Sequence, residues 1–112
     1  MSPMTESDRQ LYEMKAQVMS ALAHPTRLAI VDLLADGERC VCDIAERVDS
    51  ERTTVSRHLS MMQKAGLLES RKEGLMVFYK LKTPCVLKFL SCVSDVLRHS
   101  HASTAQLLRK LG

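Results

Sequence analysis

The chain has no run of apolar residues that approaches the roughly 18 needed to cross a membrane. Its first residues, Met1 to Arg9, lack the apolar stretch of a secretory signal. Internal repeats, low-complexity tracts and long linkers are absent too. These absences argue against a membrane protein and predict a cytoplasmic protein with one domain over residues 1–112. A chain of 112 residues is small, and such chains often gain stability by dimerising.

Positive charge is scarce in the first half of the chain and concentrated after it. Residues 1–51 carry five basic and ten acidic side chains, whereas residues 52–82 carry seven basic and two acidic ones. A basic segment in a chain whose net charge is only +3 is typical of a surface that binds a polyanion. An ordinary solvated surface would have the same composition, so the motifs must decide between the two.

The spacing of apolar residues predicts four helices in the first 65 residues. Apolar residues recur every three or four positions between Leu11 and Leu22, which predicts a helix over about 8–22. Pro25 suits the first turn of a second helix, which Gly37 ends. Two shorter helices are expected over about 41–48 and 52–65, with a tight turn between them.

After Gly66 the pattern changes to that of a hairpin and a fifth helix. Strands are expected over 67–72 and 75–81, joined at Glu73-Gly74. The fifth helix is expected from Pro84 to about His99, and a short tail helix within 103–111. A helix apolar on two sides packs against its own core and against a partner subunit. One apolar stripe of the fifth helix is Leu87, Leu90, Val93 and Leu97; the other is Cys85, Phe89, Cys92 and Val96.

The fourth helix has one apolar and one polar face. Val55, Leu59 and Met62 fall on one side at about 100° per residue, which predicts a buried stripe. The opposite side carries hydroxyls and a guanidinium, which suit base edges and phosphates in a major groove. His58 lies on the flank, where it either contacts the DNA backbone or packs. The residues expected to contact DNA are Arg52, Thr53, Ser56, Arg57, His58 and Ser60, with Arg71 and Lys72 from the hairpin.

Cys40 and Cys42 form a Cys-Val-Cys motif before the third helix. Within a helix, residues two apart point about 200° away from each other and cannot share one small ion. The two thiols converge only if Cys40 is still extended, so the pair is expected to straddle the start of the helix. The helix dipole there favours the thiolate form, which binds soft, thiophilic ions. The pattern therefore predicts a ligand or redox site.

A helix-turn-helix followed by a basic hairpin is a winged helix-turn-helix, which is mainly α-helical with a β-hairpin. Over residues 10–98 the chain resembles the ArsR/SmtB family of metal-sensing repressors. The resemblance is carried by Ala23-His24-Pro25-Thr26-Arg27-Leu28, Cys40-Val41-Cys42-Asp43-Ile44, Ser56-Arg57-His58-Leu59, Ala65-Gly66-Leu67-Leu68 and the hairpin from Arg71 to Tyr79.

The resemblance implies a homodimeric repressor that releases double-stranded operator DNA when As(III) or Sb(III) binds the cysteines. In relatives the inducer is Cd(II), Pb(II) or Zn(II). A dimer would present two reading helices one helical turn of DNA apart, which predicts an inverted-repeat operator. Other open possibilities are a thiol switch that senses oxidants or sulfide and, from another class, a Cys-x-Cys oxidoreductase. An oxidoreductase would need a βαβ unit, which the sequence lacks, so no enzyme is expected.

One common arsenite-binding pattern has a third cysteine where this chain has Ala45. The third thiolate would then come from Cys85 or Cys92, which lie about 10 Å apart along the fifth helix and cannot both take part. Cys85 is slightly favoured, because it lies at the exposed, amide-rich start of the fifth helix, where a thiolate is favoured. Cys92 lies mid-helix between Phe89 and Val96, where it is expected to be packed. A zinc site of other relatives invites comparison with Asp95, His99 and His101, whose spacing matches it poorly.

Overall fold

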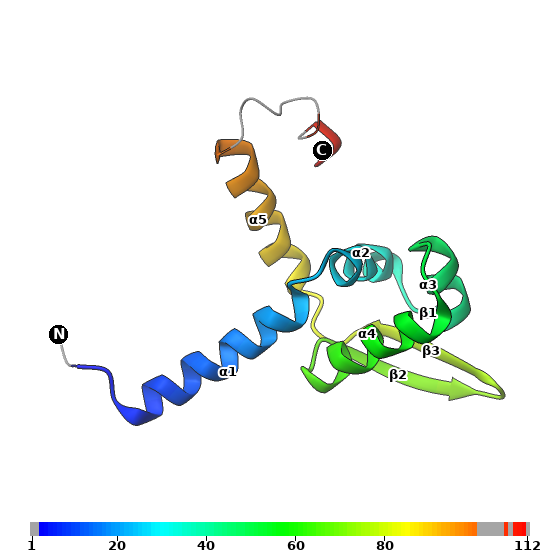
Figure 1. The fold of residues 1–112 in the computed structure, drawn as a ribbon, viewed down its shortest axis with the longest axis horizontal. Helices are drawn as coiled ribbons and strands as arrows, with labels where there is room; N and C mark the ends of the chain where they lie inside the picture. Colours follow the sequence, from blue (N-terminus) through cyan, green and yellow to red (C-terminus); the bar gives the residue numbers. More distant parts are fainter. Residues whose placement is uncertain (1–2, 101–106, 108, 112) are drawn as a thin grey trace.

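The computed structural model describes residues 3–100, 107 and 109–111 of the chain. Along the sequence, helices come before, between and after the strands of one small sheet (Figure 1). The elements are α1 (Glu6–Leu22), α2 (Pro25–Leu33), the 3-10 helix η1 (Leu34–Asp36), β1 (Arg39–Cys40), α3 (Val41–Arg47), α4 (Arg52–Lys64), β2 (Leu68–Glu73), β3 (Met76–Leu81), α5 (Val86–Ser100) and the 3-10 helix η3 (Arg109–Leu111).

The five expected helices and the hairpin are present, with shifted ends. α1 begins at Glu6 because Thr5 caps it: the Thr5 hydroxyl accepts from the Asp8 N–H at 3.1 Å, and the Asp8 carboxylate accepts from the Thr5 N–H at 3.0 Å. α5 begins at Val86, two residues after Pro84. Of the tail helix expected within 103–111, residues 103–106 and 108 lie outside the described residues.

A short strand, β1, joins the hairpin and makes a three-stranded antiparallel sheet in the order β1-β3-β2. The sequence pattern did not predict this strand, because two residues are too few to show the alternation of apolar and polar side chains that marks a strand. Glu73 pairs with Met76, so the turn is Gly74-Leu75, one residue later than expected. Gly74 takes a φ of 61°, in the left-handed region that favours glycine.

The core lies where α2, α3 and α4 meet the base of the hairpin. Val55, Leu59 and Met62 of α4 are fully buried, which confirms the predicted stripe. Burying a side chain of this size contributes about 1.5–3 kcal/mol relative to leaving it exposed. They pack with Ile30, Val31, Ile44 and Leu68, all of them also buried. Because the core holds this apolar stripe, the polar face of α4 is turned toward solvent.

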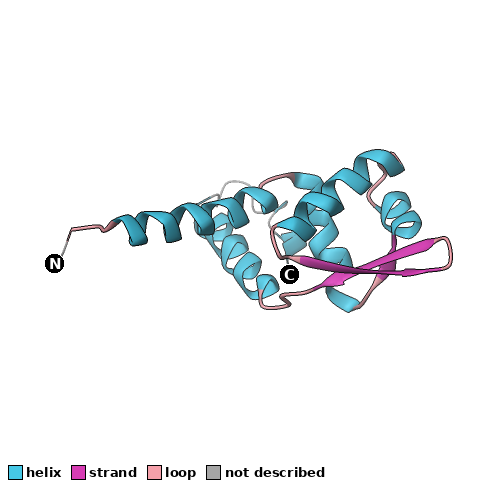
Figure 2. Ribbon diagram, turned by 90° about the horizontal axis from the view of Figure 1, so that it is seen from below, coloured by secondary structure: helices cyan, strands magenta, loops and turns pink. Residues whose placement is uncertain are grey.

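α1 and α5 project from this core on the side away from α3 and the hairpin (Figure 1), and the protomer measures 55 × 42 × 21 Å. The hairpin lies along one side of the helices (Figure 2). No single helix in the described part is long and apolar enough to cross a membrane; α1 and the segment from Pro25 to Asp36 reach that length and composition only as a pair bent by 83°.

Candidate DNA interface and thiol site

α3, a short turn and α4 form a helix-turn-helix. The turn passes through Asp49, whose φ of 49° lies in the left-handed region that Asp tolerates better than most residues. Val41, Ile44 and Ala45 bury one side of α3 in the core that also contains Val55. The two helices are therefore held together by the same apolar cluster, and their outer faces are left to solvent.

The exposed face of α4 carries the polar side chains that the sequence analysis assigned to DNA. Arg52, Thr53, Ser56, Arg57 and Ser60 are all exposed. Within the part of the chain that the structure describes, the guanidinium groups of Arg52 and Arg57 take part in no hydrogen bond or ion pair. Both charges are therefore available to phosphates or guanine edges.

His58 is turned inward from this face. It is half-buried, its Nδ1 accepts a hydrogen bond from Nε of Arg27 at 3.0 Å, and its ring lies 4.5 Å from the ring of His24, centroid to centroid. This position favours the packing alternative over a DNA contact. Burial, and then the charges of His24 and Arg27, lower the pKa of His58 below its ordinary value.

The lowered pKa of His58 predicts a loss of stability in mild acid. The unfolded chain takes up this proton first, so the contribution is complete above an unfolded pKa of about 6.5 and is lost as pH falls through the lower folded pKa. We expect His58→Asn, which can still accept from Arg27, to have a shallower fall in urea midpoint between about pH 7.5 and about pH 5.5. Equal slopes for the variant and the wild type would show that other groups cause the acid sensitivity.

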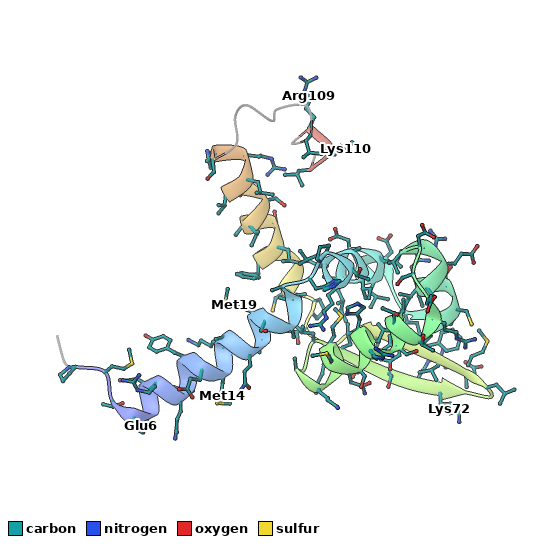
Figure 3. The ribbon with its side chains drawn as sticks, viewed as in Figure 1. Glu6, Met14, Met19, Lys72, Arg109 and Lys110 are labelled. Carbon is teal, nitrogen blue, oxygen red and sulfur yellow. The ribbon has the colours of Figure 1, made fainter. Side chains whose placement is uncertain are left out.

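The two wing residues differ sharply in their surroundings. Lys72 is exposed near the tip of the hairpin (Figure 3) and makes no side-chain ion pair with a described residue. Arg71 is also exposed but is held by Glu38 and Glu73, and its guanidinium stacks on the ring of Phe78 at 4.5 Å. The guanidinium donates hydrogen bonds to both carboxylates. The bonds to Glu38, and then the bond to Glu73, raise the pKa of Arg71. Glu38 is a residue the sequence analysis missed, since nothing local marks a partner 33 positions away.

Cys40 and Cys42 straddle the start of α3 as expected. Cys40 is the N-cap, with an extended backbone (φ −76°, ψ 158°), and its Sγ accepts from the Asp43 N–H at 3.4 Å. Cys42 lies in the first turn, is exposed, and lines a shallow groove shared with Arg52 at the start of α4. Both thiols are free. The extended backbone at Cys40 removes the obstacle that a regular helix would pose to a shared ligand.

Asp43 is the carboxylate nearest in sequence to the thiols, and it is already engaged. It binds Arg39 at 2.8 Å and Arg47 at 3.2 Å. Hydrogen bonds from Arg39, then from Arg47, lower the pKa of this carboxyl group below its ordinary value. Its role in this structure is to brace α3 against the residue before Cys40.

The other two cysteines lie elsewhere. Cys85 precedes α5 and lines an apolar groove with Val18 and Met19 of α1. Cys92 is exposed on α5, so the expected packing is absent within the protomer; its stripe faces away from the protomer's own core. Among the residues that the structure describes, no three His, Cys, Asp or Glu side chains gather closely enough to hold an ion. Asp95 pairs with Arg98 at 2.6 Å, and His101 lies outside the described residues.

Known proteins resemble this chain over most of its length. Residues 24–70 match the family described as bacterial regulatory protein, arsR family. The arsenical resistance operon repressor of Escherichia coli is 46% identical over 96 residues, which are 85% of this chain and 82% of that protein. The CadC homolog of Staphylococcus aureus, a cadmium resistance transcriptional regulatory protein, is 42% identical over 67 residues, 59% of this chain and 55% of that one.

A solved structure has the same architecture. It is the homodimeric winged helix-turn-helix DNA-binding domain of a possible ArsR-family transcriptional regulator from Mycobacterium bovis. That domain superposes with a TM-score of 0.76 at 34% identity, covering 90% of this chain and 97% of that chain. The fold is therefore a winged helix-turn-helix, with α4 as its reading helix and β2–β3 as its wing. The chain belongs to the ArsR family and is a DNA-binding transcriptional regulator, not an enzyme.

Proposed function

We propose that this regulator is a homodimeric repressor that leaves its operator when As(III) or Sb(III) binds Cys40 and Cys42. The observation that carries the proposal is the extended backbone of Cys40, one residue before α3 and two before Cys42. Two free thiols, Cys42 exposed and Cys40 half-buried, thus lie at the entrance of the helix-turn-helix, where a bound ion would act on the unit that reads DNA.

The DNA half of the proposal rests on the exposed face of α4. Arg52, Thr53, Ser56, Arg57 and Ser60 would enter the major groove, and Lys72 and Arg71 of the wing would contact the adjacent backbone. His58 would act from behind, by packing α4 against α2. Two copies related by a twofold axis would read an inverted repeat.

The dimer is supported by apolar side chains that the protomer leaves exposed on α1 and α5. In the described protomer Leu87 and Leu90 pack against the core, whereas the other stripe of α5 does not. Apolar surface of this extent is typical of an interface. The exposed residues are Leu11, Tyr12, Met14, Val18 and Met19 on α1 and Phe89, Val93, Val96 and Leu97 on α5.

These faces predict a dimer in the absence of DNA and inducer. We expect sedimentation at micromolar concentration to give twice the protomer mass of 12.6 kDa. Val93→Glu, which places a charge on the exposed face of α5, should shift the equilibrium toward the monomer, because a buried unpaired charge is costly. A wild-type protein that sediments as a monomer would contradict the assignment of these faces.

The inducer half rests on thiol chemistry and on the two relatives. Thiolates prefer soft ions, and the relatives are regulators of arsenical and of cadmium resistance. A pyramidal As(III) site takes three sulfur ligands, and the described protomer offers two at this place. The third thiolate would be Cys85 or Cys92, from the partner subunit or from the same chain after a rearrangement.

The test is release of labelled operator DNA, titrated in parallel with As(III), Sb(III), Cd(II), Pb(II), Zn(II) and an oxidant. Release by As(III) or Sb(III) at lower concentration than by the divalent ions would support the proposal. Release by Cd(II) or Pb(II) first would make the protein a sensor of those ions. Release by the oxidant alone would favour the thiol switch, and release by none of them would end the sensing proposal.

A further inference from the structure

Strand β1 brings Cys40 into one transverse row with two residues of the wing. Cys40 lies opposite Phe78 of β3, and Phe78 lies opposite Arg71 of β2. Directly opposed side chains of an antiparallel sheet lie on the same face. The stacking of Arg71 over the Phe78 ring agrees with this arrangement. One residue, Phe78, therefore stands between the thiol-bearing strand and the wing arginine.

Glu38, which precedes β1, binds Arg71 at the other end of this row. It lies two residues before Cys40, and its two carboxylate oxygens accept from Nε of Arg71 at 3.1 Å each, with a further short bond from Nη2. β1 and β2 are not neighbours, because β3 lies between them. The ion pair consequently ties the segment that carries the first thiol to the far strand of the wing.

Glu73 also binds Arg71, through Nη1 at 2.6 Å, but it lies two residues further along the same strand. This second ion pair therefore moves with the wing and links it to nothing else. Together the two carboxylates engage three of the five N–H donors of the guanidinium, and two donors remain for a phosphate. The direction in which those two point is fixed by Glu38 on one side and by the wing on the other.

We propose that Glu38 is a positioning residue that transmits a change of strand β1 to the wing by holding Arg71. The inference rests on the proposed function, in which an inducer binds Cys40. A ligand that displaces Cys40 displaces Glu38, two residues away, and the guanidinium follows its carboxylate. The remaining donors of Arg71 then turn away from the DNA backbone, and the operator is held less tightly.

The closing experiment compares Glu38→Gln with Glu73→Gln, which removes the same charge from the same guanidinium without cutting the link to β1. The measured quantity is the ratio of operator Kd with and without As(III), with arsenic binding checked by its thiolate absorbance. We expect Glu38→Gln to lower this ratio roughly three- to fivefold, the most that a half-exposed ion pair carries. Glu73→Gln should keep the ratio within a factor of about 1.5 of the wild type, since β1 stays linked.

A second experiment, amide hydrogen exchange, needs neither inducer nor DNA. It therefore tests the role of Glu38 independently of the proposed function. Amide hydrogen exchange should quicken in both β1 and β2 for Glu38→Gln, and in the wing alone for Glu73→Gln. An unaltered β1 in Glu38→Gln, or an equal loss of release in both variants, would overturn the link. A wild type that ignores As(III) would refute the proposed inducer, while the exchange arm would still decide whether Glu38 joins the two strands.

Discussion

Serine in place of Cys40 or Cys42 is expected to give a protein that binds operator DNA and is not released by As(III). As(III) is expected to lower the operator affinity of the wild type by a factor on the order of 10 to 100. The variants should lose this response completely. Serine removes the soft thiolate yet keeps a side-chain acceptor. At Cys40 this matters, because Sγ caps α3 at the Asp43 N–H and a serine hydroxyl caps at least as well. The measurement is anisotropy of labelled operator at fixed salt.

Cys85→Ser and Cys92→Ser test which residue supplies the third thiolate, since both thiols are free and exposed in the protomer. One of the two should also lose its response if it supplies the third thiolate. If both stay inducible, the site uses two thiolates or the ion is not As(III). Normal release by all four variants would show that the cysteines do not sense the inducer.

Alanine in place of Arg57 is expected to weaken operator binding by about 1–3 kcal/mol, roughly 5- to 150-fold, if its guanidinium reads a base. The side chain is exposed on α4 and makes no hydrogen bond or ion pair with a described residue, so folding should be unaffected. Because a base contact carries sequence information, the loss should be larger on the operator than on unrelated DNA.

Arg9→Ala controls for charge, since it removes an exposed guanidinium from α1, away from the reading face. Its operator affinity should stay within about twofold of the wild type at the same salt concentration. An unchanged affinity in Arg57→Ala would contradict the assignment of this face of α4 to DNA. An equal loss on operator and unrelated DNA would instead make Arg57 a phosphate contact.

The sequence predicted the helix-turn-helix and the thiol placement because both follow from local geometry. A period of 3.6 residues identifies the buried stripe through Val55 and Leu59, and the structure buries both. The extended Cys40 was inferred from the i, i+2 spacing on the premise that both thiols bind one ion, since a regular helix would point them apart, and the backbone of Cys40 is extended. Predictions of this kind need no knowledge of distant parts of the chain.

What the sequence did not predict depends on contacts between distant residues. β1 exists because Arg39 and Cys40 pair with Tyr79 and Phe78, nearly 40 positions later. The inward position of His58 depends on Arg27, 31 positions earlier. Arg71 looked like a free wing cation, yet its charge is shared with Glu38 and Glu73. Charge counts along a chain cannot show which cations are already paired across a fold.

The exposed apolar faces of α1 and α5 have a consequence for how repression depends on the cellular amount of this protein. Each protomer carries one reading helix, so the proposed twofold operator would be fully served only by two copies. Below the dimer dissociation constant, the concentration of dimers rises with the square of the chain concentration. With the proposed dimer, operator occupancy would climb more steeply than expression does, and the gene would switch off over a narrow range of protein concentration. The strength of the proposed helix interface would thereby set the threshold of the genetic switch.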